Sequence, residues 1–226
     1  MRNIAIIPAR GGSKRIPRKN IKYFMGKPII AYSIEAALKS NLFDVVMVST
    51  DDAEIAGIAR QYGAEVPFMR SERTSNDYAG IAEVIEEVLA NYYKKGVRFE
   101  NFCCILSTAP FVTETILQDS FNVFRIGRFD TLRPVVRFTY PIQRAYKMLP
   151  DNGVHFINPE YLNVRSQDLD PAYHDAGMFY WGTVESGFRG DRWGGFEVDE
   201  KYCQDIDTED DWILAEMKYT LQRKKK

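Results

Sequence analysis

Short, unbroken apolar runs alternate along the chain with longer segments in which apolar residues recur every three or four positions. An unbroken run is typical of a strand buried on both faces of a sheet, and the longer spacing is typical of a helix with one buried face. Strands are expected at residues 3–8, 44–50, 65–70, 102–107, 131–138, 176–183 and near 196–199, and helices at residues 28–40, 51–64, 81–95, 113–127 and 208–221.

The order of these elements predicts an α/β domain with a mostly parallel central sheet, because strands that alternate with helices pair in parallel. The chain has 226 residues, of which 45% are hydrophobic, and this is enough for one such domain with its own core. Ligands of parallel α/β sheets bind beyond the carboxyl ends of the strands. The functional site is therefore expected in the loops that follow the strands, within a single domain that spans residues 1–226.

The alternation stops between Thr139 and His174, in a stretch rich in aromatic residues, proline and asparagine. The sequence "DNG" (151–153) separates two short apolar runs there and is a strong hairpin signal. This pattern predicts a β-rich arm inserted at about residues 139–175. The arm is either a long surface excursion or a surface for a partner or substrate, since interfaces favour Tyr, Phe and Arg.

Charge and cysteine content exclude several classes of protein. Charged residues make up 27% of the chain but the net charge is −1, which argues against a general nucleic-acid binder. No run approaches the roughly 20 apolar residues of a membrane span, and the chain opens directly on a strand, so neither membrane association nor a signal peptide is expected. Cys103, Cys104 and Cys203 lack the spacing of a zinc site, and we expect reduced cysteines in a cytoplasmic protein.

A basic loop follows the first predicted strand. Gly11 and Gly12 let backbone amides approach a ligand closely, and cationic side chains around them can bind phosphate oxygens. The loop has neither the GxxxxGK[ST] nor the GxGxxG pattern of other phosphate-binding loops. From composition alone, a phosphate cradle and a basic loop that only faces solvent are equally good interpretations. The basic run holds Arg10, Lys14, Arg15, Arg18 and Lys19, and the candidates for phosphate among them are Arg10, Lys14 and Lys19.

An acidic segment, "DIDTEDDW" (205–212), precedes the last predicted helix. Asp205 and Asp207 stand two positions apart, which puts both carboxylates on one face if the segment is extended. Taken by itself, the segment is typical of the acidic start of a helix, with Asp207 or Thr208 as the capping residue.

The full string "PARGGSKRIPRKN" (8–20) resembles the signature of the cytidylyltransferases that activate acidic nine- and eight-carbon sugars such as sialic acid and Kdo. Further similarities to this family follow in order across nearly the whole chain. They are "RSERTSND" (70–77), with Ser71 where the family usually has Pro, "STAPF" (107–111), "RSQDL" (165–169) and "DIDTEDDW" (205–212).

Within this family, "TAPF", "RPVVRFTYPIQRA", "SQDLDPAYHDAG" and "FYWG" look most like the branch that acts on pseudaminic acid. Leu106 and the sequence "DAG" (175–177) depart from the sialic acid branch, and Met178 stands where the pseudaminic branch usually has Gln. The resemblance implies a Rossmann-like nucleotidyltransferase fold, a homodimer formed through the arm, and transfer of CMP from CTP to the anomeric hydroxyl of the sugar with release of pyrophosphate. Sialic or legionaminic acid remains an alternative acceptor. A catalytically inactive nucleotide-binding protein, or an arm that serves only in interaction, remains an alternative function.

The resemblance also implies roles for individual residues. Arg10 and Lys19 would hold the triphosphate, and Asp205 and Asp207 would bind Mg²⁺, so these four are the expected catalytic residues. The other nucleotide-binding residues would be Ala9, Gly11, Gly12, Ser13, Lys14, Asn20 at the ribose, Arg70 on the cytosine side, Asp77 and Thr108. The residues that bind the acidic nine-carbon sugar would be Gln143, Arg165, Gln167, Asp175 and Tyr180, although Arg165 also suits an interface ion pair and Tyr180 the core. The attacking hydroxyl would lose its proton to a water held by the metal or to an Asp205 or Asp207 carboxylate.

Overall fold

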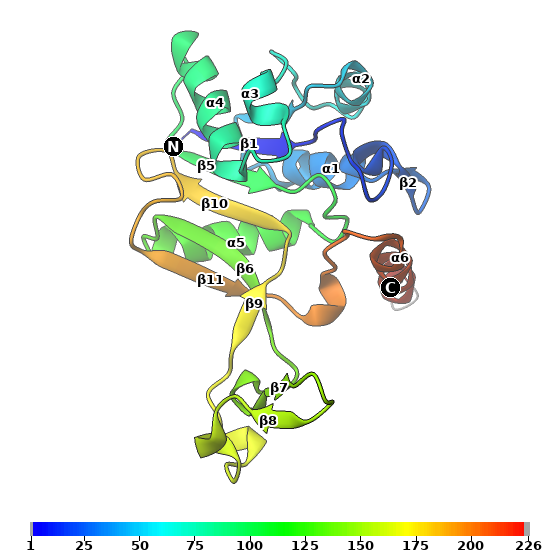
Figure 1. The fold of residues 1–226 in the computed structure, drawn as a ribbon. Helices are drawn as coiled ribbons and strands as arrows, with labels where there is room; N and C mark the ends of the chain where they lie inside the picture. Colours follow the sequence, from blue (N-terminus) through cyan, green and yellow to red (C-terminus); the bar gives the residue numbers. More distant parts are fainter. Residues whose placement is uncertain (1, 224–226) are drawn as a thin grey trace.

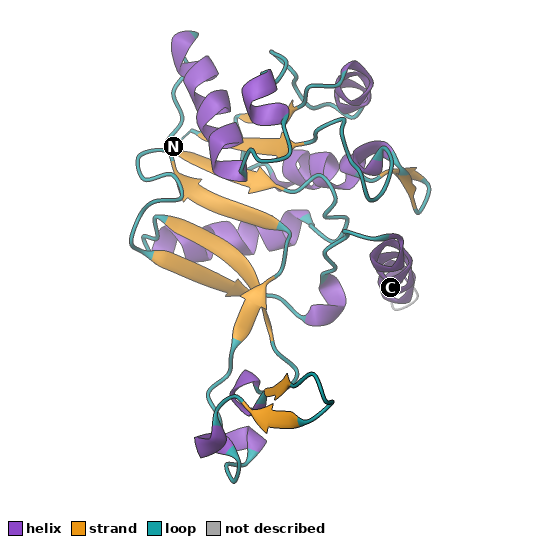
Figure 2. Cartoon of the chain, viewed as in Figure 1, coloured by secondary structure: helices purple, strands orange, loops and turns teal. Residues whose placement is uncertain are grey.

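The computed structural model describes residues 2–223, and a mixed seven-stranded sheet forms the centre of this part of the chain (Figures 1 and 2). The strand bounds are β1 Asn3–Pro8, β4 Val45–Ser49, β5 Asn101–Ile105, β6 Thr131–Arg137, β9 Tyr173–Asp175, β10 Phe179–Thr183 and β11 Trp193–Glu197. The strands lie in the order β4-β1-β5-β10-β6-β11, and β9 pairs with the outer part of β6. All run in one direction except β10 and β9, which run against the others.

Helices cover the two faces of the sheet unequally. Their bounds are α1 Ile30–Ser40, α2 Ala53–Gln61, α3 Glu72–Ser75, α4 Ile81–Lys94, α5 Glu114–Ile126 and α6 Glu209–Arg223. One core lies between the sheet and α1, α2, α5 and α6, and a second lies between the sheet and α4. In Figure 1, α5 lies behind the sheet, and no helix of the described chain crosses the front of β10, β6 and β11. None of the helices within residues 2–223 combines the length and apolar character needed to cross a bilayer.

Strand β1 shows why the middle of the sheet is an unbroken apolar run. Ala5 and Ile7 pack into the core with α1 and α5, while Ile4 and Ile6 pack into the core with α4, and all four are fully buried. Alternate residues of a strand point to opposite faces, so a strand covered on both sides needs apolar residues at every position. The predicted α/β domain is confirmed, with β10 as an antiparallel strand inserted between β5 and β6.

The segment at residues 65–70 does not form the predicted strand. Glu65 makes an isolated bridge with Met47 of β4, and Pro67 follows two positions later. Proline has no N–H to donate to a ladder, so the pairing ends there. The N–H of Arg70 still donates at 2.8 Å to the carbonyl of the residue that follows β4, which keeps the segment beside the sheet.

The first helix begins later than predicted. Pro28 pairs instead with Tyr23, in a short hairpin made of β2 (Tyr23–Phe24) and β3 (Lys27–Pro28). A residue held in a β ladder has an extended backbone and cannot also open a helix. Helix α1 therefore starts two positions further on, at Ile30.

The predicted arm projects from the body on two strands (Figure 1). The chain leaves along β6 and returns along β9, and the Phe138 N–H donates to the Ala172 carbonyl at 2.9 Å where the two strands part. We use "arm" for residues 138–172, because residues 173–175 form β9 of the main sheet.

The arm contains little regular structure. Its predicted hairpin is present as β7 (Tyr146–Met148) and β8 (Val154–Phe156), and Asn152 has a φ of +65° in the turn. Asparagine tolerates this left-handed conformation better than most residues, which suits it to such a turn. The remaining elements of the arm are the single-turn 3₁₀ helices η2 Ile142–Arg144, η3 Pro159–Tyr161 and η4 Ser166–Asp168.

The three cysteines lie in the core of the domain. Cys103 and Cys104 are fully buried in β5, Cys203 is buried before α6, and all three are free thiols. Burial raises the pKa of Cys104 to about 12, so its thiol stays protonated at neutral pH. These cysteines are core residues rather than reactive groups.

Candidate active site

A cleft of about 540 Å³ opens at the carboxyl ends of β1 and β5. Four segments that are far apart in the sequence meet there, namely the loop after β1, the α3–α4 connection, the loop after β5 and the segment before α6. Parallel strands bring such loops to one edge of a sheet. The predicted site residues that line the cleft are Arg10, Ser13, Lys14, Lys19, Asn20, Arg70, Asp77, Thr108, Asp205 and Asp207.

Gly11 of the basic loop is held against the segment that follows β4. The Gly11 N–H donates a hydrogen bond of 2.9 Å to Asp51 Oδ1. A Cβ built on Gly11 would lie 2.8 Å from Asp52 Oδ2, so a larger residue would push the loop away from α2. The preceding Ala9 is buried, and its N–H donates at 2.9 Å to the last carbonyl of β4. Gly12 is exposed.

Arg18 braces the same loop from outside the cleft. Its guanidinium donates to both carboxylate oxygens of Asp52, at 2.5 and 3.1 Å, and also pairs with Glu54. The Arg18 hydrogen bond is the main cause that lowers the pKa of Asp52 to about 2. Asp52 also caps α2, because it accepts hydrogen bonds from two N–H groups of the first turn. One of the five loop cations is thus turned toward α2 and not toward the cleft.

Arg10 and Lys14 converge on Asp77. Arg10 Nη1 donates to Asp77 Oδ1 at 2.8 Å, and Lys14 Nζ pairs with Oδ2 of the same carboxylate. The Lys14 hydrogen bond is the main cause that lowers the pKa of Asp77, and Arg10 adds to it. The Asp77 carboxylate is thus an anion held between two cations, and a phosphate group in its place would be bound in the same way. These side chains are therefore already turned toward the place where an anionic ligand would bind.

Lys19 joins the basic loop to the acidic segment at the other end of the chain. Its Nζ donates to the Ile206 carbonyl at 2.6 Å and lies 3.4 Å from Asp207 Oδ1. Arg15 approaches the same carboxylate oxygen at 3.1 Å. Two predicted catalytic residues, Lys19 and Asp207, therefore meet on one wall of the cleft although 188 positions separate them.

Asp205 lies between the cleft and a tight turn. Gly177 has a φ of +62° in this turn, and a Cβ built on it would lie 3.2 Å from Asp205 Cγ. Partial loss of water around the carboxyl, in a residue that is exposed overall, followed by the neighbouring charge of Asp207, raises the pKa of Asp205. Thr208 caps α6, because its Oγ1 accepts from the Asp211 N–H at 3.2 Å while Asp211 accepts from the Thr208 N–H at 2.8 Å. The sequence left Asp207 and Thr208 as possible capping residues of this helix, and the structure shows that Thr208 is the cap.

The two aspartates suit a hard cation only as part of a ligand set. Within residues 2–223, no group of three or more His, Cys, Asp or Glu side chains is placed to hold a metal ion. Mg²⁺ is usually bound by one or two carboxylates, with water and substrate phosphates as the other ligands. Asp205 and Asp207, beside a basic loop that suits phosphate, fit this pattern.

The inner wall of the cleft is made of buried polar side chains. Asn20 Nδ2 donates to the Arg10 carbonyl at 2.8 Å, and Ser107 Oγ donates to Asn20 Oδ1 at 2.8 Å. Arg70 is also buried, and its Nε donates to Ser49 Oγ at 3.1 Å. Burial is the main cause that lowers the pKa of Arg70. This network fixes the wall before any ligand is present.

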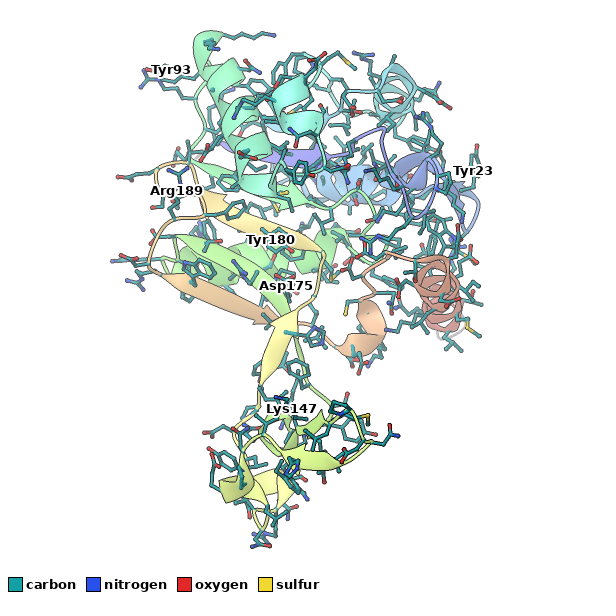
Figure 3. All side chains as sticks on the ribbon, viewed as in Figure 1. Tyr23, Tyr93, Lys147, Asp175, Tyr180 and Arg189 are labelled. Atoms are coloured by element: carbon teal, nitrogen blue, oxygen red, sulfur yellow. The ribbon has the colours of Figure 1, made fainter. Side chains whose placement is uncertain are left out.

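The five predicted sugar residues fall into two groups. Asp175 and Tyr180 lie together on the open front of the sheet (Figure 3), where the Tyr180 hydroxyl donates to Asp175 Oδ1 at 3.1 Å. Gln143, Arg165 and Gln167 lie in the arm. The Gln143 amide and the Arg165 guanidinium are used within the arm, where Arg165 forms a two-point ion pair at 2.7 and 3.2 Å. The structure does not bring these two groups together within one chain.

Comparison with known proteins decides the family. The sequence profile of a family described as "Cytidylyltransferase" matches residues 4–222. The chain belongs to the cytidylyltransferase family. A pseudaminic acid cytidylyltransferase of Campylobacter jejuni is 41% identical over 224 residues, which cover 97% of each chain. A CMP-N,N′-diacetyllegionaminic acid synthase of Legionella pneumophila is 30% identical over 229 residues, which cover 96% of this chain and 95% of the relative.

Solved structures confirm the fold. A CMP:2-keto-3-deoxy-manno-octonic acid synthetase complexed with CTP superposes with a TM-score of 0.70 at 17% sequence identity, and the match covers 99% of this chain and 100% of that chain. A likeness at this identity establishes the nucleotidyltransferase fold alone. The fold predicted from the sequence is therefore confirmed for this cytidylyltransferase.

Some residues of the cleft were not predicted. Arg15 and Ser107 both line it, and both had a signal in the sequence, because Arg15 belongs to the basic run and Ser107 ends the predicted strand at 102–107. Met178, where the pseudaminic branch of these cytidylyltransferases usually has Gln, is buried. Its side chain belongs to the core shared with α1 and α5, and its backbone carbonyl accepts from the Leu106 N–H at 2.9 Å.

Proposed function

We propose that this cytidylyltransferase transfers CMP from CTP to the anomeric hydroxyl of pseudaminic acid, an acidic nine-carbon sugar. The anomeric oxygen forms a bond to the α-phosphorus, the bond from that phosphorus to the bridging oxygen breaks, and pyrophosphate leaves. The meeting of Lys19 and Asp207 at 3.4 Å on one wall of the cleft is the observation that carries this proposal. A triphosphate needs cations around it and its metal ion needs carboxylates, and this cleft offers both.

Sequence identity supports pseudaminic acid as the acceptor. The Campylobacter pseudaminic acid cytidylyltransferase is 41% identical to this chain, whereas the Legionella legionaminic acid enzyme is 30% identical. The same reaction on legionaminic or sialic acid is the second candidate. A nucleotide-binding protein without catalysis would not need the cation and both carboxylates. Lys19, Asp205 and Asp207 are all present and all line the cleft, which favours an active enzyme.

In this proposal the basic loop neutralises the triphosphate. Arg10 and Lys14 exchange the Asp77 carboxylate for phosphate oxygens, and Arg10 binds them with two N–H groups at once. Gly12 lets phosphate approach the backbone, and Ser13 offers its hydroxyl from the wall of the cleft. The phosphoryl group gains negative charge as it is transferred, and a cation fixed beforehand stabilises that charge without reorganisation. Lys19 supplies this cation.

Asp205 and Asp207 are proposed to hold Mg²⁺. The bound ion would neutralise phosphate charge and orient the triphosphate for attack. Lys19 and the Thr208 cap hold the backbone on both sides of Asp207, which fixes the two carboxylates before the metal arrives.

The nucleoside is proposed to lie along the inner wall, with Asn20 at the ribose and Arg70 on the cytosine side. The Asn20 carboxamide is held by Ser107 and by the loop backbone, so its orientation is preset. Arg70 is a buried part of the same wall and would bring its charge to the cytosine side of the cleft. Thr108 lines the same part of the cleft.

We also propose a homodimer in which the arm of each chain reaches the cleft of the other. In one chain the arm projects from the body (Figure 1), and Lys147 of its hairpin lies far from Asp175 and Tyr180 (Figure 3). Arm residues can therefore bind the same sugar as Asp175 only if a partner supplies them. The arm also exposes apolar side chains that a dimer would bury, among them Tyr140, Tyr146, Met148, Val154 and Ile157.

The proposed reaction takes place in the cytoplasm, where CTP is available. Three free thiols and no disulfide among the described residues suit that reducing compartment. The acceptor sugar and the CMP-sugar product would then both be cytoplasmic metabolites.

Pyrophosphate release tests the proposal. The purified protein is mixed with CTP, MgCl₂ and pseudaminic acid, and pyrophosphate is measured with a coupled phosphatase assay. Release that needs all three components supports the proposal. If CTP binds but no pyrophosphate appears with pseudaminic, legionaminic or sialic acid, the proposal is wrong and a nucleotide-binding role is favoured.

A further inference from the structure

Helix α6 carries apolar side chains on two sides. Its inner side packs on the body, where Trp212 and Ala215 are buried in the core. The helix lies at the edge of the body in Figure 1, and a surface helix usually has polar residues on the side away from the core. Here that side carries a second apolar row, which we call the α6 stripe. It consists of Ile213, Leu214, Met217 and Leu221, which are between 43% and 62% exposed.

The α6 stripe borders an apolar groove. Ile213, Met217 and Leu221 follow one another at four-residue intervals, which places them in one row along the helix. Met25, at the turn between β2 and β3, stands beside this row, and a groove of about 420 Å³ lies between them. Every residue that lines the groove lies outside the proposed active site. A contiguous exposed apolar patch of this kind marks an interaction surface.

The two ends of α6 carry opposite charges. The first turn holds Glu209, Asp210 and Asp211. The helix is described to Arg223, after which the sequence continues with three lysines. A partner that covers the α6 stripe along its length therefore meets negative charge at one end and positive charge at the other. A second α6 that runs the opposite way presents these charges in complementary order, whereas a parallel one places like charges together.

The spacing of the α6 stripe suits a contact with two-fold symmetry. In such a contact the same surface serves both chains, so each residue meets either its own copy or a residue related to it by the axis. Met217 stands midway between Ile213 and Leu221 in the sequence. An axis at Met217 would pair this residue with its own copy and Ile213 with Leu221 of the second chain. A flexible methionine side chain adapts well to such a self-contact.

We infer that α6 is a self-association surface at which two copies of this chain pair through antiparallel α6 helices. The contact is separate from the proposed exchange of arms, because the α6 stripe lies outside residues 138–172. It joins dimers formed through the arms into larger assemblies. One helical row is a small surface, so this association is weaker than that of the arms and grows with protein concentration.

Disulfide trapping with Met217→Cys tests this inference. The variant is oxidised mildly in solution, and covalent dimers are measured on a non-reducing denaturing gel beside the unaltered protein. A disulfide joins two chains only where their Cα atoms come within about 7 Å, which the axis at Met217 allows. Tyr93→Cys is the matched control, because Tyr93 on α4 is 61% exposed, as Met217 is. Met217→Cys should crosslink about tenfold faster or more, since an associated pair raises the effective thiol concentration.

Ile213→Cys and Leu221→Cys test the direction of the pair. In the antiparallel arrangement a mixture of these two variants should crosslink. Ile213→Cys alone should not, because its two copies would lie about 12 Å apart along the helices at 1.5 Å per residue. Leu221→Cys alone should fail to crosslink for the same reason.

Three results would overturn the inference. The first is equal crosslinking of Met217→Cys and Tyr93→Cys. The second is crosslinking of Ile213→Cys to itself as readily as Met217→Cys, which would mean a parallel pair. The third is faster crosslinking in a mixture of Met217→Cys with Met148→Cys than in Met217→Cys alone, which would mean that the arm covers the α6 stripe. Circular dichroism checks that each variant is folded. The test needs no catalysis, so a failed pyrophosphate assay overturns only the proposed function.

Discussion

The ammonium group of Lys19 donates a hydrogen bond of 2.6 Å to the backbone carbonyl of Ile206. This contact ties the loop after the first strand to the segment before the last helix. Because Lys19 binds the backbone between Asp205 and Asp207, it positions both carboxylates whatever their charge state. The proposed phosphate site and the proposed metal site are therefore built as one unit.

Replacement of Lys19 by Met should lower kcat/KM for CTP by about 10²-fold or more, because a preorganised charge at the reacting phosphorus is lost. The measurement is pyrophosphate release at saturating sugar. Lys39→Met is the matched control, since Lys39 is 62% exposed on α1 and pairs with Glu35. Comparable activity in Lys19→Met and Lys39→Met would show that Lys19 does not act on the triphosphate.

Asp205→Asn and Asp207→Asn should each raise the Mg²⁺ concentration needed for half-maximal activity by about tenfold or more, since one of two charged oxygen ligands is lost. A Mg²⁺ titration of the initial rate measures this. Asp210→Asn removes one negative charge from the exposed first turn of α6 and should leave the titration unchanged. An identical shift in all three variants would mean that general electrostatics, and not coordination, sets the Mg²⁺ dependence.

The Arg18–Asp52 pair should make a pH-dependent contribution to stability. The folded pKa of Asp52 is about 2, below its ordinary value of 3.8, so the contribution is complete above about pH 4 and is lost as the pH falls toward 2. Asp52→Asn keeps a capping oxygen but not the charge. We expect it to lower the free energy of unfolding by about 1 kcal/mol at pH 7, after allowance for solvent screening.

Urea unfolding at several pH values checks this expectation. The difference between the unaltered protein and Asp52→Asn should shrink steadily below pH 4. Asp191→Asn, at an exposed position, should show no such difference. A constant gap between pH 7 and pH 3 would contradict the assignment of the pKa shift to folding.

The proposed exchange of arms predicts complementation between two defective chains. Lys19→Met damages the cleft and Arg165→Ala damages the arm. If each site combines a cleft from one chain with an arm from the other, a 1:1 mixture should recover about a quarter of normal activity, because half of the dimers are mixed and each has one intact site. Light scattering should show a dimer at micromolar concentration.

Recovery should require exchange of subunits, so the mixture is refolded or incubated at low concentration before assay. A mixture of Lys19→Met with Asp205→Asn is the control, because both changes damage the cleft and neither mixed site is intact. No recovery in the first mixture, together with a dimer in solution, would mean that each arm serves its own chain or only the interface.

Much of the cleft was predictable because its residues form local signals. The run from Arg10 to Asn20 follows a buried strand, and the Asp205–Asp207 pair precedes a helix, so each was visible in a short window of sequence. The parallel sheet then brings these ends together, as the general rule for α/β folds requires. The contact between Lys19 and Asp207 is the outcome of that rule.

The features that were not predicted depend on long-range packing. Strand β10 runs antiparallel because its pairing partners, β5 and β6, lie far away in the chain. The missing strand at 65–70 is different, because Pro67, which ends the pairing, is visible in the sequence. The arm was visible as a break in the pattern, but its direction away from the body was not.

The most direct test of the central claim is a competition in one reaction that contains CTP, MgCl₂ and equal amounts of pseudaminic, legionaminic and sialic acids. The products are separated and identified by mass spectrometry at early times. We predict that CMP-pseudaminic acid is the main initial product and that it forms in equal amount to pyrophosphate. A main product of CMP-sialic acid, or hydrolysis of CTP without any CMP-sugar, would contradict the account.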